Sequence, residues 1–293
     1  MPETIEILKK VKKIEIKTKH LVDGLLSGAY HSVFRGRGIE FSEVREYVAG
    51  DDIRSIDWSV TARMNHPYVK EFIEERDLTI YIVLDVSASN DFGSEKSKKE
   101  AAIELSASLM FAALRNNDKV GLCLFTDKAE KYYSPRKGKT HILRLVRDMI
   151  EYNPKSKATG LAETLRFLSK VIKKRSIIFI ISDFFTDSFE KELKILKNKH
   201  DVIAINMSDI RESEIPNVGY IELEDEETGE QLLLDTSDKE FRQSYISMMK
   251  ERNDRLNNML KKLKIDNIQL KSQEPYEIPL RKFFRLRERR MVR

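Results

Sequence analysis

The feature that most constrains the fold is an almost continuously apolar run, Leu78–Asp85, that ends abruptly in polar residues. It is rich in β-branched and aromatic side chains, the pattern of a strand buried on both faces. Three similar runs follow, at Val120–Phe125, Ser176–Ser182 and Asp201–Met207. Strands with no polar face are typical of parallel sheets that helices cover on both sides.

Between these runs, apolar residues recur at helical spacing, which predicts helices at residues 97–116, 139–151, 161–174 and 188–199. A short strand is expected at residues 130–134. The alternation of strands and helices predicts an α/β fold, with a mostly parallel, doubly wound sheet and helices on both faces.

The flanks of this region have different patterns, so three segments are predicted. Residues 1–76 form an N-terminal flanking segment rich in glycine and arginine, and residues 77–210 form the sheet domain. Residues 211–293 hold a hairpin at 217–235, a long helix at 238–264 and a basic tail, all expected to pack on the core.

Charge is distributed unevenly along the chain. The formal net charge is +5, yet residues 9–19 alone carry +5 and residues 281–293 carry +6, so the remainder carries −6. The basic ends could bind nucleic acid or an anionic membrane surface, an alternative that predicts steep salt dependence. The ordinary interpretation is a solvated run of charges.

No membrane span or secretion signal is expected. The longest apolar runs, such as Ile177–Ile181, are far shorter than the roughly 20 residues of a membrane helix. The basic stretch Lys9–Lys19 follows the start of the chain where a signal peptide would have an apolar stretch. We therefore expect a soluble, cytoplasmic protein. The single cysteine, Cys123, lies in an apolar run and is expected to be buried and structural.

Polar side chains follow the buried strands where ligands of parallel sheets gather, at the carboxyl ends. Asp85 ends the first strand and is followed at alternate positions by Ser87 and Ser89, and Asp183 directly follows the third strand. Thr159 precedes a later helix and is expected at the same edge. Two carboxylates and three hydroxyls suit Mg²⁺ or Mn²⁺, with water completing the shell.

Other interpretations of these residues remain. The hydroxyls of Ser87, Ser89 and Thr159 could merely cap helices and turns. Zinc is disfavoured, because the five histidines show no clustered spacing. Asp85 could be a phosphoryl-accepting nucleophile, but dehalogenase-like phosphatases need a second aspartate where Ser87 stands. Gly138-Lys139-Thr140 lacks the earlier glycine of a phosphate loop, since Tyr133 occupies that position.

The order Asp85-Val86-Ser87-Ala88-Ser89, Thr159, Asp183 resembles the metal-ion-dependent adhesion site of von Willebrand factor A-like domains. Four N-terminal stretches, residues 36–41, 45–47, 50–58 and 61–63, are similar to the signature of the bacterial family catalogued as domain of unknown function fifty-eight. One departure is Asn90, where that family commonly has an apolar residue.

The resemblance covers nearly the whole chain and implies a function. Members of this family are typically encoded beside MoxR-type AAA+ ATPases, which implies a chaperone-like role in the assembly or activation of client proteins. The leading hypothesis is therefore a non-enzymatic interaction module, in which the metal accepts an Asp or Glu carboxylate from a partner protein.

Overall fold

A computed structural model of the chain describes residues 2–21, 40–73, 78–87, 97–156, 158–186, 188–209, 217–224 and 231–291. The chain divides into two compact units. One comprises Phe34–Leu78, and the other comprises Met1–Val33 together with Thr79–Arg293. The segment boundaries near residues 76 and 210 stay a prediction.

The larger unit is built on a six-stranded sheet with the strand order β10-β7-β6-β3-β4-β5. Its strands are β3 (Thr79–Asp85), β4 (Lys119–Phe125), β5 (Ala129–Arg136), β6 (Ile177–Ser182), β7 (Asp201–Ser208) and β10 (Asp266–Lys271). All neighbours are parallel except β4 and β5, which are antiparallel. The predicted α/β fold with a mostly parallel sheet is confirmed.

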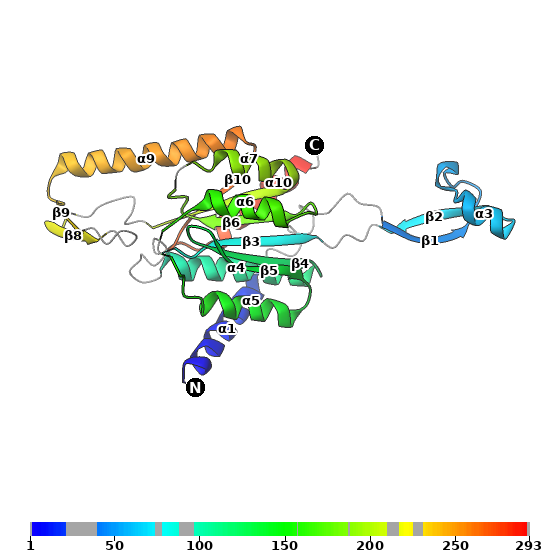
Figure 1. The fold of residues 1–293 in the computed structure, drawn as a ribbon, viewed down its shortest axis with the longest axis horizontal. Coiled ribbons are helices and arrows are strands. Elements are labelled where there is room, and N and C mark those ends of the chain that lie inside the picture. The colour runs from blue at the N-terminus through cyan, green and yellow to red at the C-terminus, as the bar shows by residue number, and fades with distance from the viewer. Residues whose placement is uncertain are drawn as a thin grey trace. The chain divides into compact units, whose positions relative to one another are not determined.

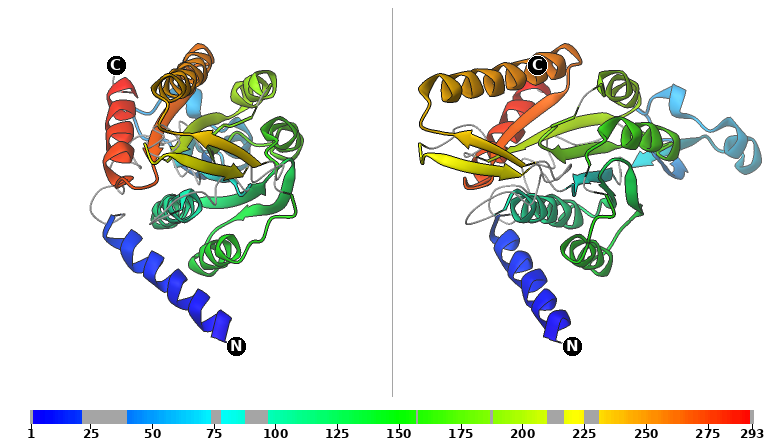
Figure 2. Two further views of the ribbon diagram at one scale, coloured as in Figure 1. Left: turned by 90° about the vertical axis from the view of Figure 1, so that its left-hand side faces the viewer. Right: turned by 60° about the vertical axis from the view of Figure 1, so that its left-hand side comes forward.

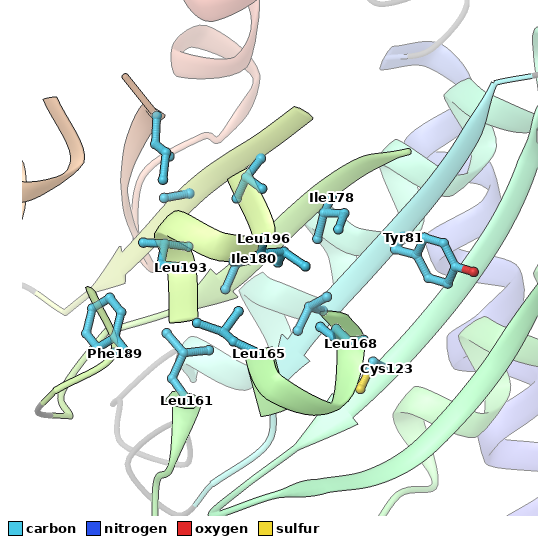
Figure 3. Close-up of a cluster of buried hydrophobic side chains, with 14 of the residues drawn as sticks. Tyr81, Cys123, Leu161, Leu165, Leu168, Ile178, Ile180, Phe189, Leu193 and Leu196 are labelled. Atoms are coloured by element: carbon cyan, nitrogen blue, oxygen red, sulfur yellow. The ribbon is translucent and has the colours of Figure 1, made fainter. Parts of the chain in front are cut away.

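Helices cover both faces of this sheet (Figures 1 and 2). α4 (Lys98–Arg115) and α5 (Lys139–Ile150) lie on one face, and α6 (Leu161–Val171) and α7 (Glu190–Lys199) lie on the other. Figure 3 shows the core beneath α6 and α7, where Leu165 and Leu193 meet strand residues such as Ile178 and Ile180. The strands are apolar on both sides because both sides are covered in this way.

Residues at both ends of α4 are of types that favour helix termini. The Ser97 hydroxyl accepts the backbone N–H of Glu100 at 3.2 Å, as a helix-capping serine does. Asn117, two residues after the end of the helix, adopts φ 57°, a left-handed conformation that asparagine tolerates. Thirteen of the helix's eighteen residues are buried, so α4 is a core element whose first turn is fixed in place.

The N-terminal segment contains a helix that the sequence patterns did not predict, α1 (Pro2–Leu21). Two ion pairs join it to helices of the same unit. Lys17 contacts Glu104 of α4 at 2.7 Å, and Glu15 contacts Lys139 of α5 at 2.6 Å. No helix in the described ranges is long and apolar enough to cross a membrane.

The C-terminal region contains the expected hairpin, formed by β8 (Tyr220–Glu224) and β9 (Gln231–Asp235), and the expected long helix α9 (Lys239–Lys262). Two further elements were not predicted. β10 adds an edge strand to the sheet, and α10 (Glu277–Met291) contains most of the basic tail. Leu280 and Phe284 anchor α10 in the core with fully buried side chains.

The smaller unit pairs β1 (Glu40–Glu46) with β2 (Tyr68–Ile73) and includes a 3₁₀ turn, η2 (Ile53–Ser55), and a short helix, α3 (Trp58–Met64). Two aspartates of this unit accept several hydrogen bonds each. Asp51 accepts two hydrogen bonds from the Arg45 guanidinium at 2.7 and 2.8 Å, and Asp57 caps α3 through the N–H groups of Ser59 and Val60.

Candidate metal centre

The register of the sheet brings the two predicted aspartates to one edge. β3 pairs in parallel with β6, with Leu84 opposite Ile181, so Asp85 and Ser182 end neighbouring strands side by side. The Ser182 hydroxyl donates a hydrogen bond of 2.6 Å to Oδ2 of Asp85. Asp183, the next residue, is near enough for its charge to affect the Asp85 carboxyl.

The Asp85 carboxylate is buried and surrounded by donors. Its Oδ1 accepts both the backbone N–H of Ser87 at 3.0 Å and the Ser87 hydroxyl at 2.7 Å. Only 2% of Asp85 and 1% of Ser87 is exposed to solvent. The Ser87 hydroxyl donates its proton to the Asp85 carboxylate, so the lone pairs of the Ser87 oxygen are left to accept. An oxygen with lone pairs to donate is the kind of ligand that a hard cation requires.

Burial raises the pKa of the Asp85 carboxyl to about 7, and the adjacent Asp183 carboxylate adds to the rise. Hydrogen bonds from Ser182 and Ser87 oppose it. The pKa of Asp85 is raised mainly because burial removes its carboxylate from water, and the charge of Asp183 adds to that effect. A cation placed between them would relieve that cost.

Asp183 is held in place by the backbone of a tight turn. Its Oδ1 accepts the N–H of Phe185 at 2.9 Å, while the Ser182 hydroxyl accepts the N–H of Phe184 at 2.9 Å. Phe184 has a φ of 54°, in the left-handed region, which bends the chain away from the strand. The turn therefore directs the Asp183 carboxylate back to the sheet edge.

One residue at the site was missed in the sequence. Lys98, the first residue of α4, is fully buried, and its Nζ lies 3.0 Å from Oδ2 of Asp183. A lysine in the first turn of a helix ordinarily extends into water, so no sequence signal distinguished it. The only hint that a cation would be needed there is that two apolar strands each end at an aspartate, Asp85 and Asp183.

Thr159 lies in the loop before α6, which is joined to both neighbouring loops at this edge. Its carbonyl accepts the Thr186 hydroxyl at 3.3 Å, linking it to the turn after Asp183. Gly160 donates its N–H to Thr126 O at 2.7 Å, after the end of β4. A Cβ on Gly160 would lie 2.3 Å from Asp127 O, so only glycine permits this approach.

The five predicted ligands therefore divide into three groups. The structure brings Asp85, Ser87 and Asp183 together, and it places Thr159 in an adjoining loop. Ser89 lies outside the described residues. Among the described residues, no three His, Cys, Asp or Glu side chains cluster to hold a metal. The residues that do meet are two carboxylates and a hydroxyl, a donor set that fits Mg²⁺ or Mn²⁺ rather than zinc.

Two other residues that the sequence analysis considered, Lys139 and Cys123, have structural roles. Lys139, in the glycine-lysine-threonine stretch, pairs with Glu15. Cys123 is fully buried in the core, as predicted, and burial raises the pKa of its thiol to about 12.

The sequence of this chain is similar to a known protein family and to several bacterial proteins. The family described as "Protein of unknown function DUF58" matches residues 43–255. The chain belongs to the DUF58 family. The uncharacterized protein Rv1480 from Mycobacterium tuberculosis is 33% identical over 224 residues, which cover 75% of this chain and 70% of that protein. The uncharacterized protein YeaD from Bacillus subtilis is 22% identical over 135 residues, 46% of this chain and 31% of that protein.

Solved structures resemble this DUF58 chain in fold alone. An aerotolerance-related membrane protein from Bacteroides fragilis, with multiple mutations to serines, aligns with a TM-score of 0.50 at 15% identity. The alignment covers 73% of this chain and all of that one. The conserved hypothetical protein BatB from Bacteroides thetaiotaomicron has a TM-score of 0.49 at 15% identity, over 72% of this chain and 99% of that one.

Proposed function

We propose that this DUF58 chain is a non-enzymatic, cytoplasmic protein-interaction module of the von Willebrand factor A-like type. It would hold Mg²⁺ or Mn²⁺ through Asp85, Ser87, Ser89, Thr159 and Asp183. The observation that carries the proposal is the meeting of Asp85, Ser87 and Asp183 at one carboxyl edge of a parallel sheet.

Each described residue has a role in this proposal. Asp85 accepts the proton of the Ser87 hydroxyl, which would leave the lone pairs of that oxygen for a metal, and the N–H of Phe185 orients Asp183. When bound, the metal would be balanced in charge by the two carboxylates, and water would hold its remaining coordination positions. An Asp or Glu side chain of a partner protein would then complete the shell.

The geometry favours this role over phosphoryl transfer. In a dehalogenase-like arrangement an acid accompanies the nucleophilic aspartate, whereas the partners of the Asp85 carboxylate here include the hydroxyls of Ser87 and Ser182. The position two residues on, where a dehalogenase-like phosphatase has its acid, holds Ser87. We therefore propose binding without catalysis.

The proposed partner is a MoxR-type AAA+ ATPase, as the family resemblance implies, and the module would act with it in chaperone-like assembly or activation of clients. The coordinating carboxylate would come from the ATPase or from a client. Nucleotide hydrolysis would belong to the ATPase, because this chain's only phosphate-loop-like stretch lacks the required glycine.

The basic ends support the alternative surface-binding role less well. Lys17 of α1 pairs with Glu104, and Arg287 and Arg290 of α10 pair with Asp266 at 3.4 and 2.7 Å. These side chains form ion pairs with carboxylates of the same chain. Part of the positive charge of the two ends is therefore neutralised and contributes less to binding an anionic surface.

The proposal is tested by the binding of the purified ATPase to wild type, Asp85→Ala and Asp183→Ala, each with Mg²⁺ and with EDTA. Asp254→Ala, which removes an exposed carboxylate from α9, is the matched control. We expect wild type and the control to bind only with Mg²⁺, and both site variants to bind poorly throughout. Equal binding by correctly folded site variants in EDTA would contradict the proposal, and steep salt dependence without a chelator effect would favour the basic ends.

A further inference from the structure

The carboxyl edge at which we propose a metal already holds a cation of the chain itself. Lys98 begins α4, and none of its side chain is exposed. A buried ammonium is costly unless a carboxylate pairs with it, and Nζ of Lys98 lies 3.0 Å from Oδ2 of Asp183. This contact joins the first turn of α4 to the end of β6.

A metal ion bound by Asp183 would share this carboxylate with Lys98. Oδ1 of Asp183 accepts the N–H of Phe185 at 2.9 Å, and Oδ2 is the oxygen that Lys98 contacts. A divalent ion using Oδ2, directly or through water, would come close to the Lys98 ammonium. Two cations in a buried site repel strongly, since the low local dielectric screens them little.

We propose that Lys98 is the internal counter-ion of Asp183, and that a divalent metal ion must displace it in order to bind. The inference rests on the proposed metal function and adds a regulatory step to it. Lys98 sets the metal concentration at which the site fills, because binding must replace an existing ion pair. Metal binding also releases the side chain that fastens the first turn of α4 to Asp183.

Two different structural roles for Lys98 make different predictions. A lysine that only neutralises Asp183 would stay buried whether or not metal is present. A lysine that competes with metal would leave its position when the site fills. Removing a competing ammonium should also strengthen metal binding, whereas removing the neighbouring Lys99, which has the same charge, should not.

The first measurement is calorimetric titration of Mg²⁺ into wild type, Lys98→Met and Lys99→Met, each checked for folding by circular dichroism. We expect Lys98→Met to bind Mg²⁺ about tenfold more tightly than wild type or more, and Lys99→Met to match wild type. Equal or weaker binding by Lys98→Met would overturn the competition while leaving the metal site itself standing. Binding by Lys98→Met alone would support the competition and contradict a metal-loaded wild type, and binding by neither protein would refute both.

The second measurement needs only the wild-type chain, so it holds even if Lys98→Met does not fold. Lysines are acetylated with a water-soluble reagent, with and without saturating Mg²⁺, and each site is quantified by mass spectrometry. Lys139, whose side chain is 61% exposed, is the internal reference. We expect Lys98 to be protected without Mg²⁺ and to become several-fold more reactive with it. Continued protection of Lys98 at Mg²⁺ saturation would overturn its displacement.

Discussion

At the scale of single residues, the carboxyl edge brings two carboxylates together with hydroxyl and ammonium donors. Asp85 and Asp183 are both buried, and the hydroxyls of Ser87 and Ser182 are committed to Asp85. The two aspartates and Ser87 were predictable because they directly follow apolar strands. Lys98 was not, since its burial depends on where α4 begins relative to β6, which only the tertiary structure sets.

The raised pKa of Asp85 gives a pH prediction for the metal-free chain. Its folded pKa, about 7, exceeds the ordinary value of 3.8, so the fold favours the protonated acid. This contribution to stability is fully present below about pH 4 and is lost as the pH rises toward 7. Denaturant unfolding from pH 4 to 8 should show wild type losing stability relative to Asp85→Asn over this range. Parallel pH profiles of the two proteins would contradict the raised pKa.

A second residue-scale prediction concerns the smaller unit. The Arg45 guanidinium, together with the N–H of Val48, lowers the pKa of the Asp51 carboxyl to about 2. Arg45→Gln should therefore raise the Asp51 pKa by about one unit or more, as loss of an adjacent arginine does. Carboxyl carbon NMR titration of the full chain measures it, and an unchanged pKa would show that the pair does not persist in solution.

At the scale of elements, the strands buried on both faces were predictable and the elements at the margins were not. β3, β4, β6 and β7 have continuous apolar runs because helices cover both sides. β10 is an edge strand whose sequence, Asp266–Lys271, mixes polar and apolar residues, so it resembles a loop. The apolar residues of α1 are interspersed with lysines, and its contacts with α4 and α5 make its place evident.

The loop that carries Thr159 gives an element-scale prediction. Gly160→Ala would place a Cβ 2.3 Å from Asp127 O, so the loop must shift away from the end of β4. We expect a loss of about 1–3 kcal/mol in the free energy of unfolding, typical of overpacking at a rigid site. Lys155→Ala, in the same loop with an exposed side chain, should change it by less than about 0.5 kcal/mol. Equal effects of the two substitutions in urea unfolding would contradict the close approach.

At the scale of the whole molecule, the C-terminal region completes the sheet unit. β10 pairs with β7, and α10 places Phe284, which is fully buried, in the same core. Phe284→Ala should therefore lower the free energy of unfolding by about 3–5 kcal/mol, whereas Leu286→Ala, at a residue that is 45% exposed, should cost far less. Similar values for both in chemical denaturation would show that α10 does not share the core.

The central claim is that the carboxyl edge of the sheet holds one divalent metal ion. Crystals grown with Mn²⁺ test it most directly, because anomalous scattering locates manganese without reference to the protein. We predict a single strong peak among Asp85, Ser87, Thr159 and Asp183, within about 2–2.5 Å of at least one of their oxygens, with the Lys98 side chain moved away from Asp183. No peak at this edge at saturating Mn²⁺, with Lys98 still on Asp183, would contradict the account.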